Sequence, residues 1–438
     1  MISSIVFIVL LIAASLLFAK NVKTIVRNIK LGRDLDRSDR KNERFSLMAR
    51  VALGQSKMVV RPVAGLLHIV VYLGFIIINI EVLEIVLDGI TGKHRLFAPL
   101  GSIYYGLISA FEYLALAVLV ACAIFLIRRN VLRLKRFHNS EMTSWPKSDA
   151  NLILITEIML MGAFLLMNAA DAQLQVLGAE HYTQVGSFPI SSVFMKMMGG
   201  MSEGSLIILE RGLWWFHIIG IFAFLNYLPY SKHFHIILAF PNVFYSKLSP
   251  KGQLDNMEAV KKEVELMFDP SADPYAAPPE PQGEPQRFGA KDVTDLTWKQ
   301  LMDSYTCTEC GRCTDVCPAN GTGKKLSPRK IMMDTRDRLE EVGKGIDKNG
   351  KDFNDGKSLL RDYITEEELL ACTSCNACTE ACPVNNDPLS VIVDLRRYLI
   401  MEESKAPAEW TGIFTNIENN GAPWQFAQAD RLNWKNEQ

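Results

Sequence analysis

Five apolar segments dominate the first 245 residues and set the strongest limit on the fold. Each is close to the length of about 20 residues that a membrane-spanning helix needs. Lipid offers the backbone no hydrogen-bonding partner, so a segment that crosses it must satisfy its own amide and carbonyl groups as a helix. The sequence therefore predicts an all-α protein whose membrane domain, residues 1–245, holds five helices. They cover roughly residues 3–19, 62–87, 101–127, 151–169 and 205–230.

The orientation of these helices follows from the charges in their loops. The first segment has no basic region before its apolar core and no convincing cleavage site after it, so we expect a retained helix. Residues 20–61 hold twelve Lys or Arg and residues 128–150 hold six, whereas 89–100 hold two and 170–204 hold one. The positive-inside bias predicts a multi-pass protein of the bacterial cytoplasmic membrane, with the N-terminus outside and everything after residue 230 in the cytoplasm.

Six ionisable residues lie in or beside these segments, where a charge in lipid is costly. They are candidates for a proton path or a polar ligand site, although headgroup contact would satisfy those near helix ends. The six are Glu81, Glu84, Glu112, Glu157, Glu210 and Arg211.

Histidines on the fifth segment indicate a cofactor. His217 and His235 are eighteen residues apart, which is five helical turns, so they would face the same way about 27 Å apart, while His233 faces elsewhere. Two histidines on one stripe suit two stacked haems. The alternative is that His233 and His235 are interfacial basic residues. The second segment offers His68 as a partner on another helix, or as a hydrogen-bonded core residue.

The stretches GQSKMVVRPVAGLLHIVVYLGF and WWFHIIGIFAFLNYLPYSKHFHIILAFPN resemble a family of five-helix cytochrome b subunits. This family contains the respiratory nitrate reductase gamma subunit and the membrane subunits of heterodisulfide-reductase-like complexes, and the resemblance covers about residues 1–245. Members with two haems carry two histidines ten residues apart on the second helix and two eighteen apart on the fifth. In this sequence His217 and His235 match the fifth-helix pair, His68 matches one second-helix position, and the other falls on Met58.

The resemblance implies one haem b held by His68 and His217. For the two to lie at equal depth, the second helix must begin near Gly54 and pass through Pro62 as a tolerated kink. A second haem would be bound by Met58 opposite His235, since His/Met ligation is a known haem arrangement. The alternative is that the second haem is absent.

Two cysteine runs, CTECGRCTDVCPAN and CTSCNACTEACPVN, hold eight of the nine cysteines, and Cys122 stands alone in an apolar segment. Both have the form C-x2-C-x2-C-x3-C-P, in which three thiolates bind one cubane and the fourth ligates the other. One predicted [4Fe-4S] cluster is bound by Cys307, Cys310, Cys313 and Cys382. The other is bound by Cys372, Cys375, Cys378 and Cys317. Disulfides do not explain so regular a spacing, and zinc sites usually use paired C-x2-C knuckles.

The residues between the runs show helical periodicity, with start signals at Ser327-Pro328 and Thr365. Over about residues 290–402 the sequence resembles the α-helical ferredoxin domain of heterodisulfide reductases and related quinone-linked enzymes. The stretch DPSADPYAAPPEPQGEPQRFG, within a predicted linker at 246–289, is typical of an exposed, semi-rigid connector.

The tail, residues 403–438, resembles the segment that in larger fused relatives leads into cysteine-rich CCG domains. The resemblance implies that a CCG-domain protein docks there as a separate subunit, or that such a module is missing. Three tryptophans in residues 410–438 would be costly to leave in water, which favours docking.

These features predict a membrane-bound electron-transfer subunit that passes electrons between a cytoplasmic redox partner and membrane quinone. A net charge of −1 indicates no nucleic-acid partner. No Gly-rich dinucleotide loop follows a strand, so a flavin would belong to a partner such as an electron-transfer flavoprotein, and the substrate-converting site would lie there too. No catalytic residue is assigned. The alternatives are an anchor and electron conduit that never binds quinone, and a redox sensor, although no output domain is recognisable.

Overall fold

The computed structural model describes residues 2–250, 252–270, 287–425 and 427–436. Within these ranges every regular element is helical and no strand forms, which confirms the all-α prediction. Most of the predicted connector, residues 271–286, lies outside the described residues.

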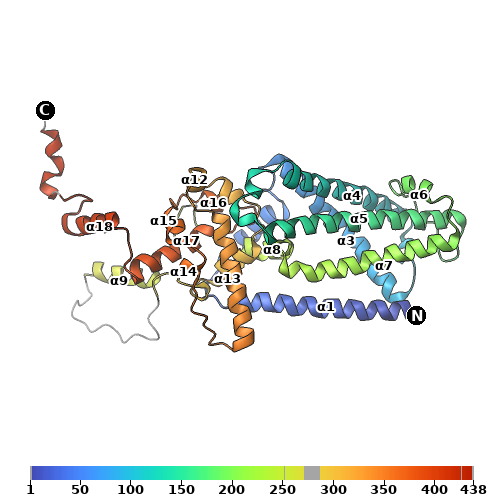
Figure 1. Cartoon of the computed structure of the whole chain (residues 1–438), viewed down its shortest axis with the longest axis horizontal. Helices are drawn as coiled ribbons and strands as arrows, with labels where there is room; N and C mark the ends of the chain where they lie inside the picture. Colours follow the sequence, from blue (N-terminus) through green and yellow to red (C-terminus); the bar gives the residue numbers. More distant parts are fainter. Residues whose placement is uncertain (1, 251, 271–286, 426, 437–438) are drawn as a thin grey trace.

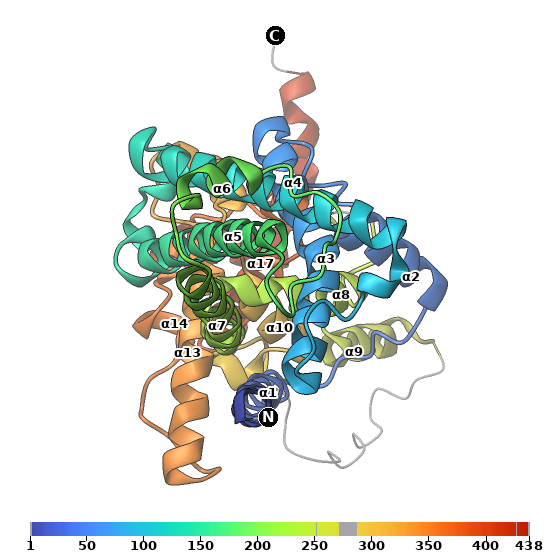
Figure 2. The same ribbon diagram turned by 90° about the vertical axis from the view of Figure 1, so that its right-hand side faces the viewer.

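Five long helices form a bundle in the N-terminal half (Figure 1), and each is long and apolar enough to cross a membrane, as predicted. Helix α5 packs against α4 and α7, α3 packs against α4, and α1 packs against α3 and α7. Seen along the bundle, α1 lies at its edge (Figure 2). The five are α1 (Ile2–Ile29), α3 (Pro62–Thr91), α4 (Ser102–Leu126), α5 (Trp145–Leu177) and α7 (Glu203–Tyr227).

Short helices and turns cap the end of the bundle that faces the C-terminal half. They are α2 (Lys41–Met48), a π-turn (Ala49–Leu53), 3₁₀ turns at Lys135–Phe137, Ser140–Met142, Leu228–Tyr230 and Lys232–Phe234, and α8 (His235–Phe244). The opposite end carries a 3₁₀ turn (Ala98–Leu100) and α6 (Ser192–Met198).

The C-terminal half is built from short helices around the longer α13. Two begin with capping boxes in which a threonine and the residue three positions on satisfy each other's backbone amides, Thr297 with Gln300 and Thr365 with Glu368. The elements are α10 (Trp298–Thr306), α11 (Arg312–Asp315), α12 (Pro318–Gly321), α13 (Pro328–Asn349), α14 (Leu359–Asp362), α15 (Glu366–Leu370), α16 (Ala377–Ala381) and α17 (Pro388–Arg397). Helices α9 (Glu258–Phe268) and α18 (Ala408–Asn420) lie at the end remote from the bundle (Figure 1).

Helix α1 joins the two halves because its last turns enter the core of the C-terminal half. Ile25 and Ile29 share one hydrophobic core with residues of α10 and α13. Asn28 donates a hydrogen bond of 2.9 Å to the Tyr305 hydroxyl, and Arg27 pairs with Asp347 at 2.6 Å. The two halves therefore have a fixed relative position.

Two helix boundaries differ from the sequence-based expectation. The second long helix begins at Pro62 and not near Gly54, because Arg61 is extended, as the residue before a proline prefers, and the preceding π-turn ends at Leu53. The fifth helix ends at Tyr227, where a 3₁₀ turn containing Pro229 follows, and His235 begins the separate helix α8. The predicted five-turn stripe from His217 to His235 on one helix is therefore wrong.

Candidate electron-transfer site

The last cysteine of the first run lies with the first three of the second run. Together these four line one cavity, closed by Pro318 and Pro328 and by the apolar side chains of Leu326, Leu389 and Ile392. The second run wraps around it because Ser374 and Asn376 adopt left-handed conformations, with φ of 55° and 61°. The lining cysteines are Cys317, Cys372, Cys375 and Cys378.

The other four cysteines gather where α11 packs against α16. Burial raises the pKa of Cys307 to about 12, with Glu309 and then Cys382 and Cys310 contributing. Burial likewise raises the pKa of Cys313 well above its usual value, and Cys307, Cys310 and Cys382 add to this shift. Thiols that raise one another's pKa lie close enough for their charges to interact, and metal binding would displace their protons.

The donor set fits two iron-sulfur cubanes. All eight cysteines are free thiols. Backbone amides donate to two sulfurs, from Ser374 to Cys372 at 3.4 Å and from Asn386 to Cys382 at 3.3 Å. Such N–H···S bonds are among the features that tune cluster potentials.

The loop of the first run docks directly on the membrane half. Arg312 donates to the carbonyl oxygen of Lys57 at 2.7 Å, and Asp315 pairs with Arg61 at 2.6 Å. Lys57 in turn donates to the carbonyl oxygen of Cys382 at 3.3 Å. The first-run cysteines therefore lie on the side of the C-terminal half that touches the bundle.

Glu309, between Cys307 and Cys310, is a buried contact of this loop. Its carboxylate accepts hydrogen bonds from Lys232 and Arg336. Burial acts to raise the pKa of Glu309, but the charges of Lys232 and Arg336 outweigh it and hold that pKa below its usual value. Sequence reasoning missed Lys232 and Glu309, although an acid inside a cluster loop and a lysine three residues before a candidate haem ligand were visible signals.

The structure brings His68 together with His235. Their ring centres are 6.4 Å apart, and His233 lies edge-on to His235 at 5.6 Å. His235 donates from Nδ1 to the carbonyl oxygen of Lys232 at 2.9 Å, which leaves Nε2 free. Burial, and then the neighbouring His235, lower the pKa of His233 to about 3, and burial lowers the pKa of His235. Neutral imidazoles of this kind are metal ligands.

His217 lies deeper in the bundle than His68, and the pairing expected between them remains a prediction. His68 is six residues, about 9 Å, into α3, whereas His217 is ten residues, about 15 Å, before the end of α7. His217 donates from Nδ1 to the carbonyl oxygen of Leu160 at 3.0 Å, and its ring packs on Phe164.

Met58, which the sequence suggests as a ligand opposite His235, lies beside Arg312 of the C-terminal half. It stands in the turn before α3, and its sulfur is 3.6 Å from a guanidinium nitrogen of Arg312. Because the helix does not extend back to this residue, Met58 faces the C-terminal half and not the interior of the bundle.

His68 and His235 fit one haem iron. Metal–imidazole bonds of about 2.0 to 2.1 Å on opposite faces of an iron place two ring centres about 6 Å apart. The observed 6.4 Å agrees with this separation. The Nδ1 atom of His68 is buried without a hydrogen-bond partner, and a carbonyl orients His235 in the way typical of metal-bound histidines.

Three of the predicted ionisable residues belong to a buried polar network at the opposite end of the bundle. Glu84 accepts from the Tyr104 hydroxyl at 2.7 Å, and Glu112 accepts from the amide of Ile190 at 2.9 Å. Glu81 lies 3.8 Å from Arg95, which pairs with Asp171 at 2.7 Å. Sequence reasoning treated Arg95 as a loop charge and did not consider Asp171.

The other predicted ionisable residues lie outside this network. Glu210 pairs with Arg211 at 2.5 Å and accepts from the Tyr182 hydroxyl at 3.0 Å. Glu157 lies farther along α5, toward Cys122.

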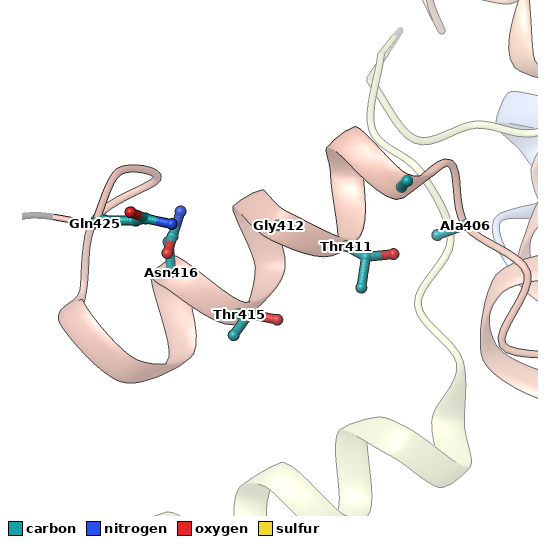
Figure 3. Close-up of a pocket in the computed structure, with 7 residues that line it drawn as sticks. Ala406, Thr411, Gly412, Thr415, Asn416 and Gln425 are labelled. Carbon is teal, nitrogen blue, oxygen red and sulfur yellow. The ribbon is translucent and has the colours of Figure 1, made fainter.

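A shallow pocket on the tail offers no redox chemistry. Figure 3 shows its lining around α18, which consists of small and amide side chains without a metal ligand or an acid-base group. The lining residues are Ala406, Ala408, Thr411, Gly412, Thr415, Asn416 and Gln425.

Comparisons with known proteins support the iron-sulfur assignment. The family described as "4Fe-4S dicluster domain" matches residues 306–386. The chain is 29% identical, over 99% of its length, to the "Probable iron-sulfur-binding oxidoreductase FadF" of Bacillus subtilis. It is 26% identical, over 92% of its length, to the "EtfAB:quinone oxidoreductase" of Syntrophomonas wolfei. It spans 61% and 55% of the lengths of these two relatives.

A third relative extends the comparison to heterodisulfide reductases. It is one component of the dihydromethanophenazine:CoB–CoM heterodisulfide reductase of Methanosarcina acetivorans, and it is 28% identical over 33% of this chain and 35% of its own length. No solved structure matches. The chain is therefore a homologue of iron-sulfur oxidoreductases and of heterodisulfide-reductase-type proteins, with a 4Fe-4S dicluster domain and five helices able to span a membrane.

Proposed function

We propose that this protein is the membrane electron-transfer subunit of a quinone-linked oxidoreductase. The observation that carries the proposal is one junction between the two halves. The loop of the first cysteine run contacts Lys232, and the carbonyl of Lys232 holds His235 beside His68. Candidate iron-sulfur ligands and candidate haem ligands thus meet at a single point.

We assign the two clusters as the sequence predicts, to Cys307, Cys310, Cys313 and Cys382, and to Cys372, Cys375, Cys378 and Cys317. Cys375 is exposed, whereas Cys307 is buried next to the bundle. Electrons would therefore exchange with a soluble partner at the second cluster and with the membrane half at the first. This order matches the expectation that the C-terminal half, residues 290–402, lies in the cytoplasm.

The membrane half would hold one haem b between His68 and His235. When bound, the haem supplies a one-electron carrier that connects the cubanes to the lipid phase. The chain's own contribution is to place His68 beside His235 and to fix His235 through the Lys232 carbonyl. We do not extend the proposal to a second haem, because Met58 faces Arg312.

A quinone is the proposed membrane substrate. One relative is named an EtfAB:quinone oxidoreductase, which supports both a quinone and a flavoprotein donor. The network at the far end of the bundle supports proton exchange. There Arg95 lies 3.8 Å from Glu81 and pairs with Asp171 at 2.7 Å, and the Tyr104 hydroxyl connects it to Glu84. Ionisable groups buried inside a membrane domain often mark proton or substrate pathways, so this network is a candidate route for the protons of the quinone.

A CCG-domain protein is the proposed partner at residues 403–438. Helix α18 stands away from the body of the C-terminal half (Figure 1). It exposes Ile413, Phe414 and Ile417, and Trp424 and Trp434 beyond it are also exposed. The similarity to a component of a heterodisulfide reductase supports this class of partner.

Quinol-dependent reduction of haem tests the function. We expect the anaerobically purified protein to show b-type absorbance and two [4Fe-4S] clusters, and menadiol to reduce the haem promptly. A haem that dithionite reduces but menadiol does not would exclude quinone chemistry and leave the alternative of a membrane anchor and electron conduit.

A further inference from the structure

Lys232 has contacts in both halves of the molecule. Its ammonium group donates to Glu309 and, at 2.6 Å, to the carbonyl oxygen of Pro146. It also lies 3.7 Å from the carboxylate of Asp149, at the start of α5. The side chain is 9% exposed and that of Glu309 is 2% exposed, so water does not screen this pair.

Glu309 is held from both sides by cations. Lys232 approaches from the bundle, and Arg336 of α13 donates to the other carboxylate oxygen at 2.8 Å. The backbone of Glu309 is left-handed, with φ of 53°, which turns its side chain out of the cysteine loop. The carboxylate therefore fixes the loop between Cys307 and Cys310 to a defined point on the membrane half.

A buried ion pair is a poor means of gaining stability. The cost of removing two charges from water offsets much of their attraction, and apolar residues of similar size often serve as well. The pair is better explained by a role in positioning the cysteine loop relative to His235. The Lys232 side chain donates a hydrogen bond to Glu309 of the cysteine loop, and the Lys232 carbonyl accepts one from His235. One residue thus sets the distance between the two candidate redox centres.

We infer that Lys232 and Glu309 are positioning residues for electron transfer between the first iron-sulfur cluster and the haem at His235. The inference rests on the proposed function. With both groups bound, one electron would leave the reduced cluster and enter the ferric haem, so the cluster would be oxidised by one electron and the haem iron reduced by one. Neither Lys232 nor Glu309 gains or loses a proton in this step.

The charges of the pair also act on the cluster potential. A nearby positive charge favours the reduced, more negative cluster, and a nearby negative charge disfavours it. We therefore expect Lys232→Met to lower the midpoint potential of the first cluster and Glu309→Gln to raise it. The double variant should return close to the wild-type potential, because it removes one charge of each sign.

The experiment compares Lys232→Met, Glu309→Gln, the double variant and Lys232→Arg in the full chain. Lys325→Met is the matched control, because Lys325 forms an ion pair with Glu367 in which both side chains are largely exposed, at 70% and 60%. Iron and haem contents are measured first. Midpoint potentials then come from redox titration followed by electron paramagnetic resonance, and haem reduction is followed optically after flash photoreduction of the clusters by deazaflavin.

We expect full iron and haem in these variants, opposite potential shifts in the two single variants, and slower haem reduction in Lys232→Met. Haem reduction in the double variant should remain about tenfold slower than in wild type. Because the cluster potential is restored in this variant, the slower rate would report the loss of positioning and not the loss of charge. Lys232→Arg should recover most of the rate, and Lys325→Met should not differ from wild type.

Unshifted potentials together with a wild-type rate in Lys232→Met would overturn the inference. Wild-type protein without iron or haem would instead refute the proposed function, so the two failures are distinguishable. A single variant that leaves a buried charge unpaired can fail to fold. In that case the double variant tests the inference, because it removes both charges of the pair and Arg336 still pairs with Asp337 at 3.0 Å.

Discussion

At the scale of single residues, the exchange of the fourth cysteine explains why the two runs form one unit. Cys317 lies in the cavity of the second run, and Cys382 contributes to the raised pKa values of the first. Each proposed cluster thus depends on a residue at least 55 positions away in the sequence. Neither site would be complete in a fragment that contained one run.

Double substitutions test this exchange through iron content. Cys382→Ser should remove one cluster and about half of the iron, because a cubane requires its four ligands. Adding Cys310→Ser should cost no further iron, since both ligands belong to the same cluster, whereas adding Cys378→Ser should remove the second cluster. Cys122→Ser is the matched control and should keep all the iron. The reverse pattern for the two double variants would mean that each run binds its own cluster.

Histidine substitutions test which imidazoles hold haem. His68→Ala and His235→Ala should each abolish the b-type absorbance, because either change leaves the iron with one protein ligand. His217→Ala should keep the absorbance, since its imidazole is hydrogen-bonded to Leu160 in another part of the bundle. Loss of haem in His217→Ala with retention in His235→Ala would restore the pairing expected from the sequence.

At the scale of elements, helix ends decide the geometry of the site. The end of α7 at Tyr227 and the new start at His235 turn the second ligand toward α3. In the C-terminal half, the capping box of Thr365 and Glu368 starts α15 directly before Cys372. Glu368 also pairs with Lys330 of α13 at 2.9 Å, so this cap connects the second cysteine run to the longest helix of its domain.

Removing this cap should loosen the second cluster. Thr365→Ala deletes the hydroxyl that accepts a hydrogen bond from the amide of Glu368 at 3.3 Å. Loss of this cap should lower the free energy of unfolding by about 1 kcal/mol. Iron-sulfur absorbance on heating should then disappear about 2 to 4 °C earlier than in wild type. Thr415→Ala, at an exposed position of α18, should leave the temperature unchanged. An equal shift in the two variants would argue against a specific role for the cap.

At the scale of the whole molecule, the basic loops and the C-terminal half lie at one end of the bundle. Arg61 pairs with Asp315, and Glu141, in the second basic loop, pairs with Arg329 at 2.7 Å. The loop between α5 and α6, residues 178–191, lies at the opposite end (Figure 1). If the positive-inside bias holds, these two ends face opposite sides of the membrane.

Labelling of introduced cysteines tests this orientation. Glu180→Cys should react with a membrane-impermeant maleimide in intact cells, because residue 180 is exposed and predicted to lie outside. Lys351→Cys, equally exposed but in the C-terminal half, should react only after permeabilisation. Labelling of Lys351→Cys in intact cells would invert the proposed topology.

Local patterns predicted much of this protein correctly. Five apolar runs were enough to predict five helices, and helical periodicity was enough to predict an all-α C-terminal half, because both follow from neighbours along the chain. The dicluster match over residues 306–386 agrees with the cysteine spacing. The meeting of His68 with His235, the enclosure of Glu309 by Lys232 and the burial of Arg95 with Asp171 had no local signature. These contacts join residues 76 or more positions apart. They depend on where prolines begin or end helices and on how the helices pack against one another. The spacing of residues along the chain does not encode either of these.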